Sequence, residues 1–153
     1  MKFPTRQITK TIDVTWNQDT RQKLISFWAA RRFHFHDPSD ASLSATRGHI
    51  LWNLISFDMS RLRADLKICP LQSDRVSIVL TEITIFQQIT QWNQMFWKLE
   101  MNTCESFLLR GDLRERDWNK FLKDNRKAAI AWALTMGLGG QRVPQKSDEK
   151  QQN

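Results

Sequence analysis

The chain has 153 residues, of which 41% are hydrophobic and 25% are charged, with five Gly and only two Cys. This length and composition fit one folded domain and exclude collagen-like, disulfide-scaffold and low-complexity proteins. Its 23 Lys and Arg outnumber 16 Asp and Glu, and the resulting net charge of +7 favours polyanionic partners such as nucleic acid, anionic lipid headgroups or an acidic protein.

The first third of the chain changes between strand and helix patterns. Residues 6–16 alternate strictly, with β-branched residues on both parities, which predicts a half-buried strand. Polar residues then introduce a helix expected over 19–31. Period two returns at 33–36, and a second strand region is expected over 43–55, with Gly48 as a bulge.

The middle of the chain predicts a hairpin followed by a helix. Residues 61–70 alternate between apolar and charged side chains, as in a strand with one buried face. Residues 76–86 are apolar on both parities, which predicts a central strand covered on both faces, or a strand with one face packed in an assembly. Helical spacing begins near residue 88 and ends at Gly111. Trp97 lies off the apolar stripe of this helix, so we expect it at the surface or at an interface.

A last, long helix is expected over 114–136, ended by the glycines that follow it. The predicted element order is therefore β-α-β-β-β-α-α. It predicts an α+β fold in two layers, an antiparallel sheet of about four strands with the helices packed on one face and a long C-terminal helix. We expect a single domain over 1–141 and a disordered polar tail over 142–153.

The cysteines and the apolar segments bear on the compartment. Cys69 and Cys104 belong to no CxxC pair, which favours reduced thiols. The N-terminal segment has no apolar run of the kind found in secretory signals. Residues 128–141 are too few and too rich in Gly to span a bilayer. We expect a cytoplasmic protein, and peripheral membrane association stays open.

A metal site is one reading of the histidines. His34 and His36 flank Phe35 and would project from the same face of a strand, where His49 from a neighbouring strand could complete a three-histidine site. Two histidines at this spacing are also ordinary on a solvated strand face, and the usual zinc spacings are absent. The sequence therefore predicts no metal and no cofactor.

Motifs for catalysis are not visible. The chain contains no GxSxG elbow, no Ser-x-x-Lys and no glycine-rich phosphate loop between a strand and a helix. Glu82 lies within the apolar strand 76–86, where a buried carboxylate could act as a general base. A structural pairing with an Arg such as Arg63 is the more ordinary role. We therefore expect a protein that is not an enzyme.

Basic residues give a candidate binding face. Arg61, Arg63 and Lys67 share one parity of the strand 61–70, an arrangement that can contact a phosphate backbone without reading bases. Burial of the apolar parity would turn all three outward. The alternative is that this face is simply solvated.

The order of the elements resembles that of START-type helix-grip domains, with a first strand, a short helix, an antiparallel meander and a long last helix. The short helix of this chain enters on Leu24, Phe27 and Trp28. The resemblance implies an apolar ligand held between a curved sheet and the last helix, although that family has six or more strands. The residues expected to line such a pocket are Trp118, Phe121 and Trp132.

Three classes of function follow, of which the third is an uncatalogued enzyme or a metal protein that uses the His34/His36 pair. The first is a small non-enzymatic basic protein that binds a macromolecular partner or self-associates, with a protein partner or a homo-oligomer expected and nucleic acid or an anionic membrane surface as alternatives. The second is a carrier of a small apolar ligand in a START-like pocket. The sequence names neither the partner nor the ligand.

Overall fold

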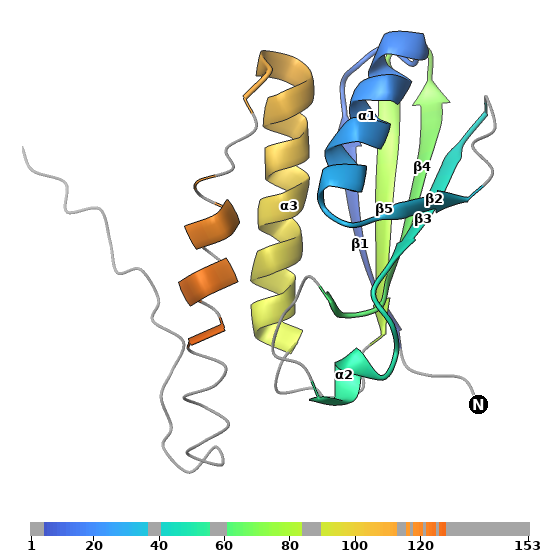
Figure 1. The fold of residues 1–153 in the computed structure, drawn as a ribbon. Helices are drawn as coiled ribbons and strands as arrows, with labels where there is room; N and C mark the ends of the chain where they lie inside the picture. Colours follow the sequence, from blue (N-terminus) through green and yellow to red (C-terminus); the bar gives the residue numbers. More distant parts are fainter. Residues whose placement is uncertain are drawn as a thin grey trace, which may run out of the picture.

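The computed structural model describes residues 5–36, 41–55, 61–83 and 90–112, and beyond them residues 116, 118–120, 122–124 and 126–127. In chain order the elements are β1 (Thr5–Ile12), α1 (Gln18–Ala30), β2 (His34–His36), β3 (Leu43–Arg47), α2 (Trp52–Ile55), β4 (Ala64–Gln72), β5 (Arg75–Ile83) and α3 (Thr90–Arg110) (Figure 1). Among the described helices, none combines the length and the apolar character needed to cross a membrane.

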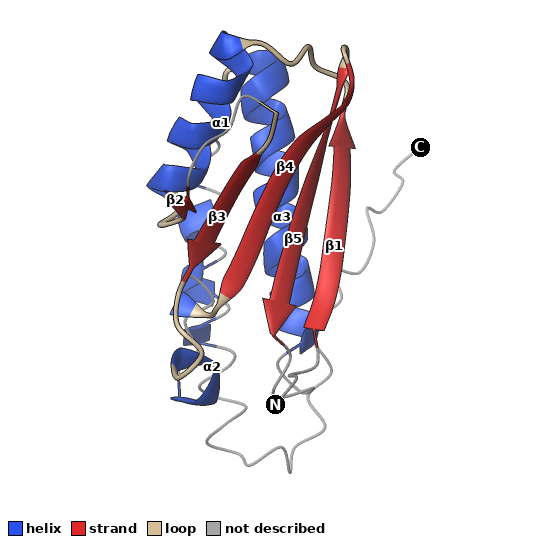
Figure 2. Ribbon diagram, turned by 90° about the vertical axis from the view of Figure 1, so that its right-hand side faces the viewer, coloured by secondary structure: helices blue, strands red, loops and turns tan. Residues whose placement is uncertain are grey.

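All five strands form one antiparallel sheet in the order β1-β5-β4-β3-β2. The first strand therefore lies beside the last, and the three-residue strand β2 forms the opposite edge. Figure 2 shows α1 and α3 together behind the sheet, so these two helices cover the same face. The described chain is thus an α+β fold with two layers, as the sequence predicts.

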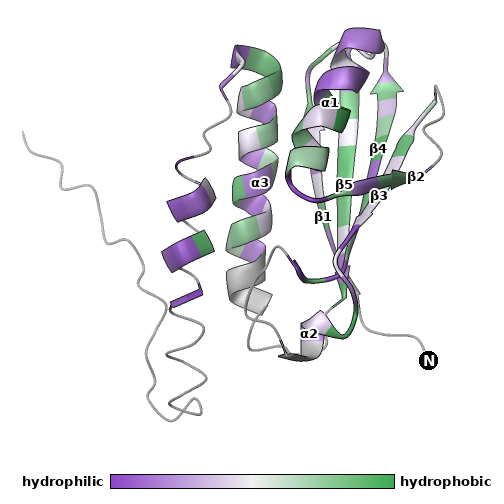
Figure 3. Cartoon of the chain, viewed as in Figure 1, coloured by the Kyte–Doolittle hydropathy of each residue, from purple (hydrophilic) through white to green (hydrophobic). Residues whose placement is uncertain are grey.

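Alternation along the strands decides which side chains face the helices. In β4, Ala64, Leu66 and Ile68 are buried, whereas Asp65 and Lys67 between them are exposed. The burial of apolar side chains against α1 and α3 is the main stabilising contribution to such a fold. Figure 3 shows hydrophobic stretches on β4, β5 and α3, and hydrophilic residues over the first turn of α1.

Aromatic side chains join the two helices to each other and to the sheet. Phe27 of α1 stacks on Phe107 of α3 with ring centroids 5.6 Å apart, and Trp28 meets Phe33 edge to face at 5.3 Å. Phe96 and Trp97 of α3 are fully buried. The core therefore lies between the helices and one face of the sheet.

The predicted number of strands is wrong. Residues 34–36, where the sequence shows period two, form the separate strand β2, which the predicted element order does not count. The region 43–55 divides into β3 and the short helix α2, because the chain turns at Gly48. Among the described residues the sheet therefore has five strands, where about four were predicted.

The predicted long helix over 114–136 is not borne out. The described residues between 116 and 127 are helical, but the remainder of that range lies outside the described residues. The long helix that the structure does show, α3, comes earlier in the chain. The expected tail over 142–153 also lies outside the described residues.

The second face of the sheet is open in the described part of the chain. β5 is central, between β1 and β4, as predicted. Its outward-facing Val79 and Ile83 are only partly buried, and no described helix lies over them (Figure 2). Among the described residues α1 and α3 cover only the other face, although Ser77 on this parity is 8% exposed, and packing of this face in an assembly stays a prediction. Residues 84–86 lie outside the described part of the chain.

Candidate anion-binding site

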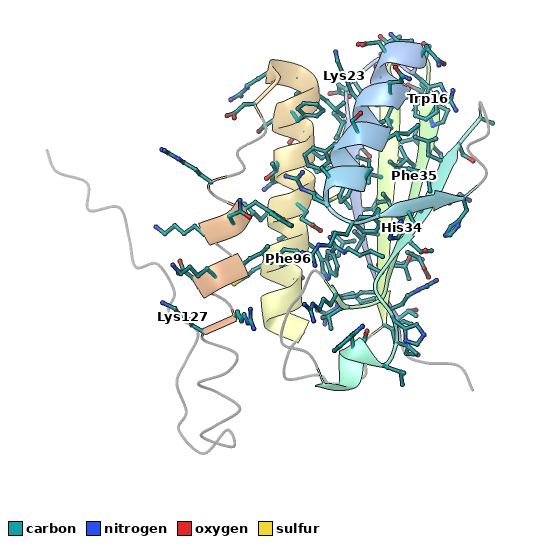
Figure 4. All side chains as sticks on the ribbon, viewed as in Figure 1. Trp16, Lys23, His34, Phe35, Phe96 and Lys127 are labelled. Carbon is teal, nitrogen blue, oxygen red and sulfur yellow. The ribbon has the colours of Figure 1, made fainter. Side chains whose placement is uncertain are left out.

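A pocket of about 280 Å³ lies near the C-terminal end of α1, where β2, β3 and α2 meet. Figure 4 labels one of its residues, His34, on β2. The side chains and backbone that line it belong to Arg32, His34, Arg47, Gly48, His49, Trp52 and Arg61. None of these residues is acidic. Their charge therefore favours an anionic occupant.

The end of α1 positions Arg32. The amide of Arg32 donates to the carbonyl of Ala29 at 2.9 Å, and the amide of Phe33 donates to the carbonyl of Trp28 at 3.0 Å. These two bonds form a Schellman motif, in which the residue after the helix cap takes the left-handed conformation. Arg32 occupies that position with φ of 67°. In this conformation a residue with a Cβ atom lowers the stability of the fold by about 1 kcal/mol relative to Gly, which is the usual residue there.

A close crossing of two segments positions Arg61. Gly48 has φ of 69°, and a Cβ atom on it would lie only 2.2 Å from the carbonyl oxygen of Arg61 and 2.3 Å from that of Leu62. The amide of His49 donates to the same Arg61 carbonyl at 3.3 Å. The glycine thus allows the segment before β4 to pass against the end of β3, which brings Arg61 to the pocket.

Helix α2 places an indole in the wall of the pocket. The side-chain amide of Asn53 donates to the carbonyl of Ile83 at 3.0 Å and accepts from the amide of Arg63 at 2.8 Å, which fixes α2 to β5 and to the start of β4. The neighbouring Trp52 remains 40% exposed. The Arg61 guanidinium carbon lies 5.3 Å from the centroid of a Trp52 ring, within reach of a cation–π interaction.

The hydrogen bonding of His49 indicates which of its nitrogens can donate. Nδ1 of His49 accepts from the amide of Leu51 at 3.2 Å, and its backbone carbonyl accepts from the amide of Trp52 at 3.0 Å. In the neutral ring the proton then lies on Nε2. This imidazole can therefore offer a hydrogen-bond donor without being charged.

Arg47 contributes to the pocket wall, but its charge is neutralised inside the domain. Its Nη1 lies 2.8 Å from Oε1 of Glu100 and its Nη2 lies 3.2 Å from Oε2. Nη1 also donates to the carbonyl of Arg31 at 3.1 Å. The other cationic side chains of the lining are Arg32 and Arg61, with His34 and His49 beside them.

All three residues of the predicted basic face lie within the described part of the chain. β4 begins at Ala64, so Arg61 precedes the strand and lines the pocket. Nη2 of Arg63 lies 2.8 Å from Oδ1 of Asp65. Lys67 is exposed on the open face of the sheet. Only Arg61 therefore belongs to the pocket.

The three histidines are not gathered at one point. His34 and His49 both line the pocket, whereas Nε2 of His36 lies 2.8 Å from the hydroxyl oxygen of Thr46. Within the ranges that the structure describes, no group of three or more His, Cys, Asp or Glu side chains could hold a metal ion.

The residues expected around an apolar pocket can be placed only in part. Trp118 is partly buried, with its ring centroid 6.1 Å from that of Phe96 and the Arg31 guanidinium carbon 5.2 Å away. Phe121 and Trp132 lie outside the described residues.

The predicted exposure of Trp97 is wrong, because its side chain is fully buried and its indole donates to a carboxylate oxygen of Glu82. That contact also gives Glu82 a structural role between β5 and α3. The sequence offers Arg63 as a partner for this carboxylate, whereas in the structure Nη2 of Arg63 lies 2.8 Å from Oδ1 of Asp65.

Sequence reasoning missed Arg32 and Trp52. The absence of Gly or Asn after 19–31 was the available signal for Arg32, since a helix followed directly by a strand needs a left-handed residue between them. Trp52 gave no signal, because the region 43–55 was interpreted as a strand.

No family model, curated protein or solved structure matches this chain.

Proposed function

We propose that this chain is a non-enzymatic binding protein that holds an anionic group of a macromolecular partner in the pocket of Arg32, Arg61, His34 and His49. The observation that carries the proposal is the lining of the pocket, whose described residues combine these four basic side chains with Trp52 and include no carboxylate. The same described residues include no Ser, Thr or Cys, which supports binding over nucleophilic catalysis.

The chemistry of the lining suits an oxyanion. A guanidinium presents a planar fork of N–H donors that matches the oxygens of a phosphate or a carboxylate, and such charged hydrogen bonds are about twice as strong as neutral ones. Arg32 and Arg61 come from separate segments, so they can contact an anion from two directions. The net charge of +7 would attract a polyanion over a longer range.

The surface beside the pocket supports a partner larger than a small ion. His34 lies both in the pocket and on the outward side of β2, where it is paired with Thr46 of β3. The row continues across the sheet through Asp65, Thr81 and Gln7. Lys67 is exposed on the same face. The pocket thus continues into an open, polar sheet face.

A carrier of an apolar ligand has less support. The space between the sheet and α3 is filled by Phe96, Trp97 and Met101, each at most 1% exposed. A ligand there would have to displace packed side chains, at a cost of several kcal/mol.

The proposal is tested with fluorescently labelled inorganic polyphosphate, a polyanion without bases. Arg32→Gly and Arg61→Gln should each weaken binding, and each should reduce the slope of log affinity against log salt by roughly 0.7–0.9. Arg110→Gln is the matched control, because it removes one charge from the exposed end of α3, away from α2 (Figure 1). Equal losses in all three variants would show that net charge, and not the pocket, binds the polyanion.

A further inference from the structure

We propose that the anionic partner is single-stranded nucleic acid, one nucleotide of which places its phosphate between Arg32 and Arg61 and its base against Trp52. This inference rests on the proposed function and adds to it the recognition of a base. It follows from what lies next to the cationic side chains, since an anion alone would require no aromatic wall.

Trp52 has the properties of a stacking platform. Its side chain is 40% exposed, and the preceding Leu51 is 60% exposed, so apolar surface faces solvent at this point. The two hydrogen bonds of Asn53 hold α2 against the sheet and therefore restrict the indole. An exposed aromatic ring held in place beside basic residues is the arrangement with which proteins bind unpaired bases.

The position of Arg61 connects the ring to the phosphate. Its guanidinium carbon lies 5.3 Å from the centroid of the Trp52 ring, and both residues line the same pocket as Arg32. A base stacked on Trp52 would therefore have its own phosphate within the reach of a guanidinium. The donor on Nε2 of His49 is available to the same oxyanion.

The size of the pocket favours an unpaired nucleotide over a duplex. A volume of about 280 Å³ is at the lower end of the range for small-molecule sites, which suits one ring and one phosphate. In a duplex the bases are stacked inside and only their edges are accessible, so Trp52 would find no base face. A single strand offers both groups at once.

The open face of the sheet offers a surface along which the rest of the nucleic-acid strand could lie. His34 leads from the pocket to β2 and pairs with Thr46 of β3, which pairs in turn with Asp65 of β4, and Lys67 is exposed two residues farther along β4. Hydroxyl and ammonium groups of this kind contact phosphates without reading sequence. We therefore expect little preference among bases.

The experiment measures the fluorescence anisotropy of three labelled ligands of equal charge per strand: a twelve-nucleotide oligothymidine, an abasic phosphodiester of the same length and a duplex. The chain should bind the oligothymidine about tenfold more tightly than the abasic strand, and the duplex should resemble the abasic strand. Trp52→Leu should remove that preference, and Trp52→Phe, which keeps a ring, should retain most of it. Met95→Ala, which truncates another exposed apolar side chain, is the control.

The outcomes separate this inference from the proposed function. Equal affinities for oligothymidine and the abasic strand, unaffected by Trp52→Leu, would overturn base recognition. If Arg61→Gln still weakened both ligands, anion binding in the pocket would stand. If Arg61→Gln changed neither, both proposals would fall. Tighter, Trp52-dependent binding to vesicles containing phosphatidylserine than to oligothymidine would assign the site to a membrane surface and overturn the inference.

Discussion

The guanidinium of Arg47 faces the carboxylate of Glu100 inside the domain, and neither side chain is exposed to solvent. The pair joins β3 to α3 across the core. The guanidinium carbon of Arg47 also lies 4.4 Å from the centroid of the Phe33 ring and 4.8 Å from that of Trp97, so aromatic rings enclose the charge. Two buried charges with two hydrogen bonds between them tolerate the loss of neither partner alone.

The first prediction concerns this ion pair. Arg47→Met should lower the free energy of unfolding by about 3–5 kcal/mol, because it leaves the Glu100 carboxylate buried without its counter-charge. The double variant Arg47→Met/Glu100→Leu should recover most of that loss, since two apolar side chains of similar volume need no pairing. Urea denaturation measures both. A double variant as unstable as Arg47→Met would show that packing, and not the orphaned charge, determines the loss.

The second prediction concerns alkaline pH. Burial raises the pKa of the Cys104 thiol from its ordinary value of 9.0, an effect that the nearby charge of Arg31 opposes only in part. Above about pH 9 the unfolded chain loses this proton and the folded chain keeps it, so the folded state binds more protons and stability falls as pH rises. The free energy of unfolding should decrease by about 1.4 kcal/mol per pH unit there.

Cys104→Ala is the control for this pH dependence. The variant loses stability at every pH because it leaves a cavity in the core, but between pH 8 and 10 its curve should be flatter than that of the wild type. Parallel curves would mean that other groups cause the alkaline loss. Cys69 is only partly buried and is present in both proteins, so it does not contribute to the difference between their pH dependences.

The sequence predicts the elements that depend on local alternation. The parity of 61–70 identifies the buried and the exposed faces of β4, with Leu66 buried and Lys67 exposed as expected. The same kind of pattern does not predict the buried face of α3, because the apolar stripe of that helix does not include Glu100. The structure turns Glu100 and Trp97 inward, because their partners Arg47 and Glu82 lie on strands far away in the sequence. Periodicity cannot show a polar group that is buried with a distant partner.

The sequence names His34, His49 and Arg61 as candidates but could not bring them together, because the lining comes from three stretches of the chain, 32–34, 47–52 and 61. Gly48 was correctly recognised as an irregularity but interpreted as a bulge within one long strand, and that interpretation placed His49 and Trp52 in the strand as well. Only the carbonyl groups of Arg61 and Leu62, which lie against Gly48, explain why the chain turns there. Such a contact depends on tertiary structure and leaves no local pattern.

The third prediction tests this crossing. Gly48→Ala should lower the free energy of unfolding by about 3 kcal/mol, because the new Cβ overlaps two backbone carbonyls and φ is positive. It should also weaken polyphosphate binding, since Arg61 must move. Gly111→Ala is the matched control: its φ is +73°, but its Cβ would meet nothing within 4 Å. That variant should lose only about 1 kcal/mol and bind normally. If both variants lost the same stability, the positive φ alone, and not the overlap with the carbonyls, would explain the effect of Gly48→Ala.

The last prediction separates binding from stability at one residue. Arg32 has a positive φ at the end of α1, where Gly would relieve about 1 kcal/mol of strain. Arg32→Gly should therefore raise the free energy of unfolding by about 0.5–1 kcal/mol while weakening the binding of polyphosphate. Arg32→Ala removes the same charge and keeps the strain, so it should bind as weakly without the gain in stability. Urea denaturation and anisotropy at one salt concentration measure the two effects. If Arg32→Gly bound polyphosphate as tightly as the wild type, the guanidinium would have no part in the site, and the strained position would have no functional explanation.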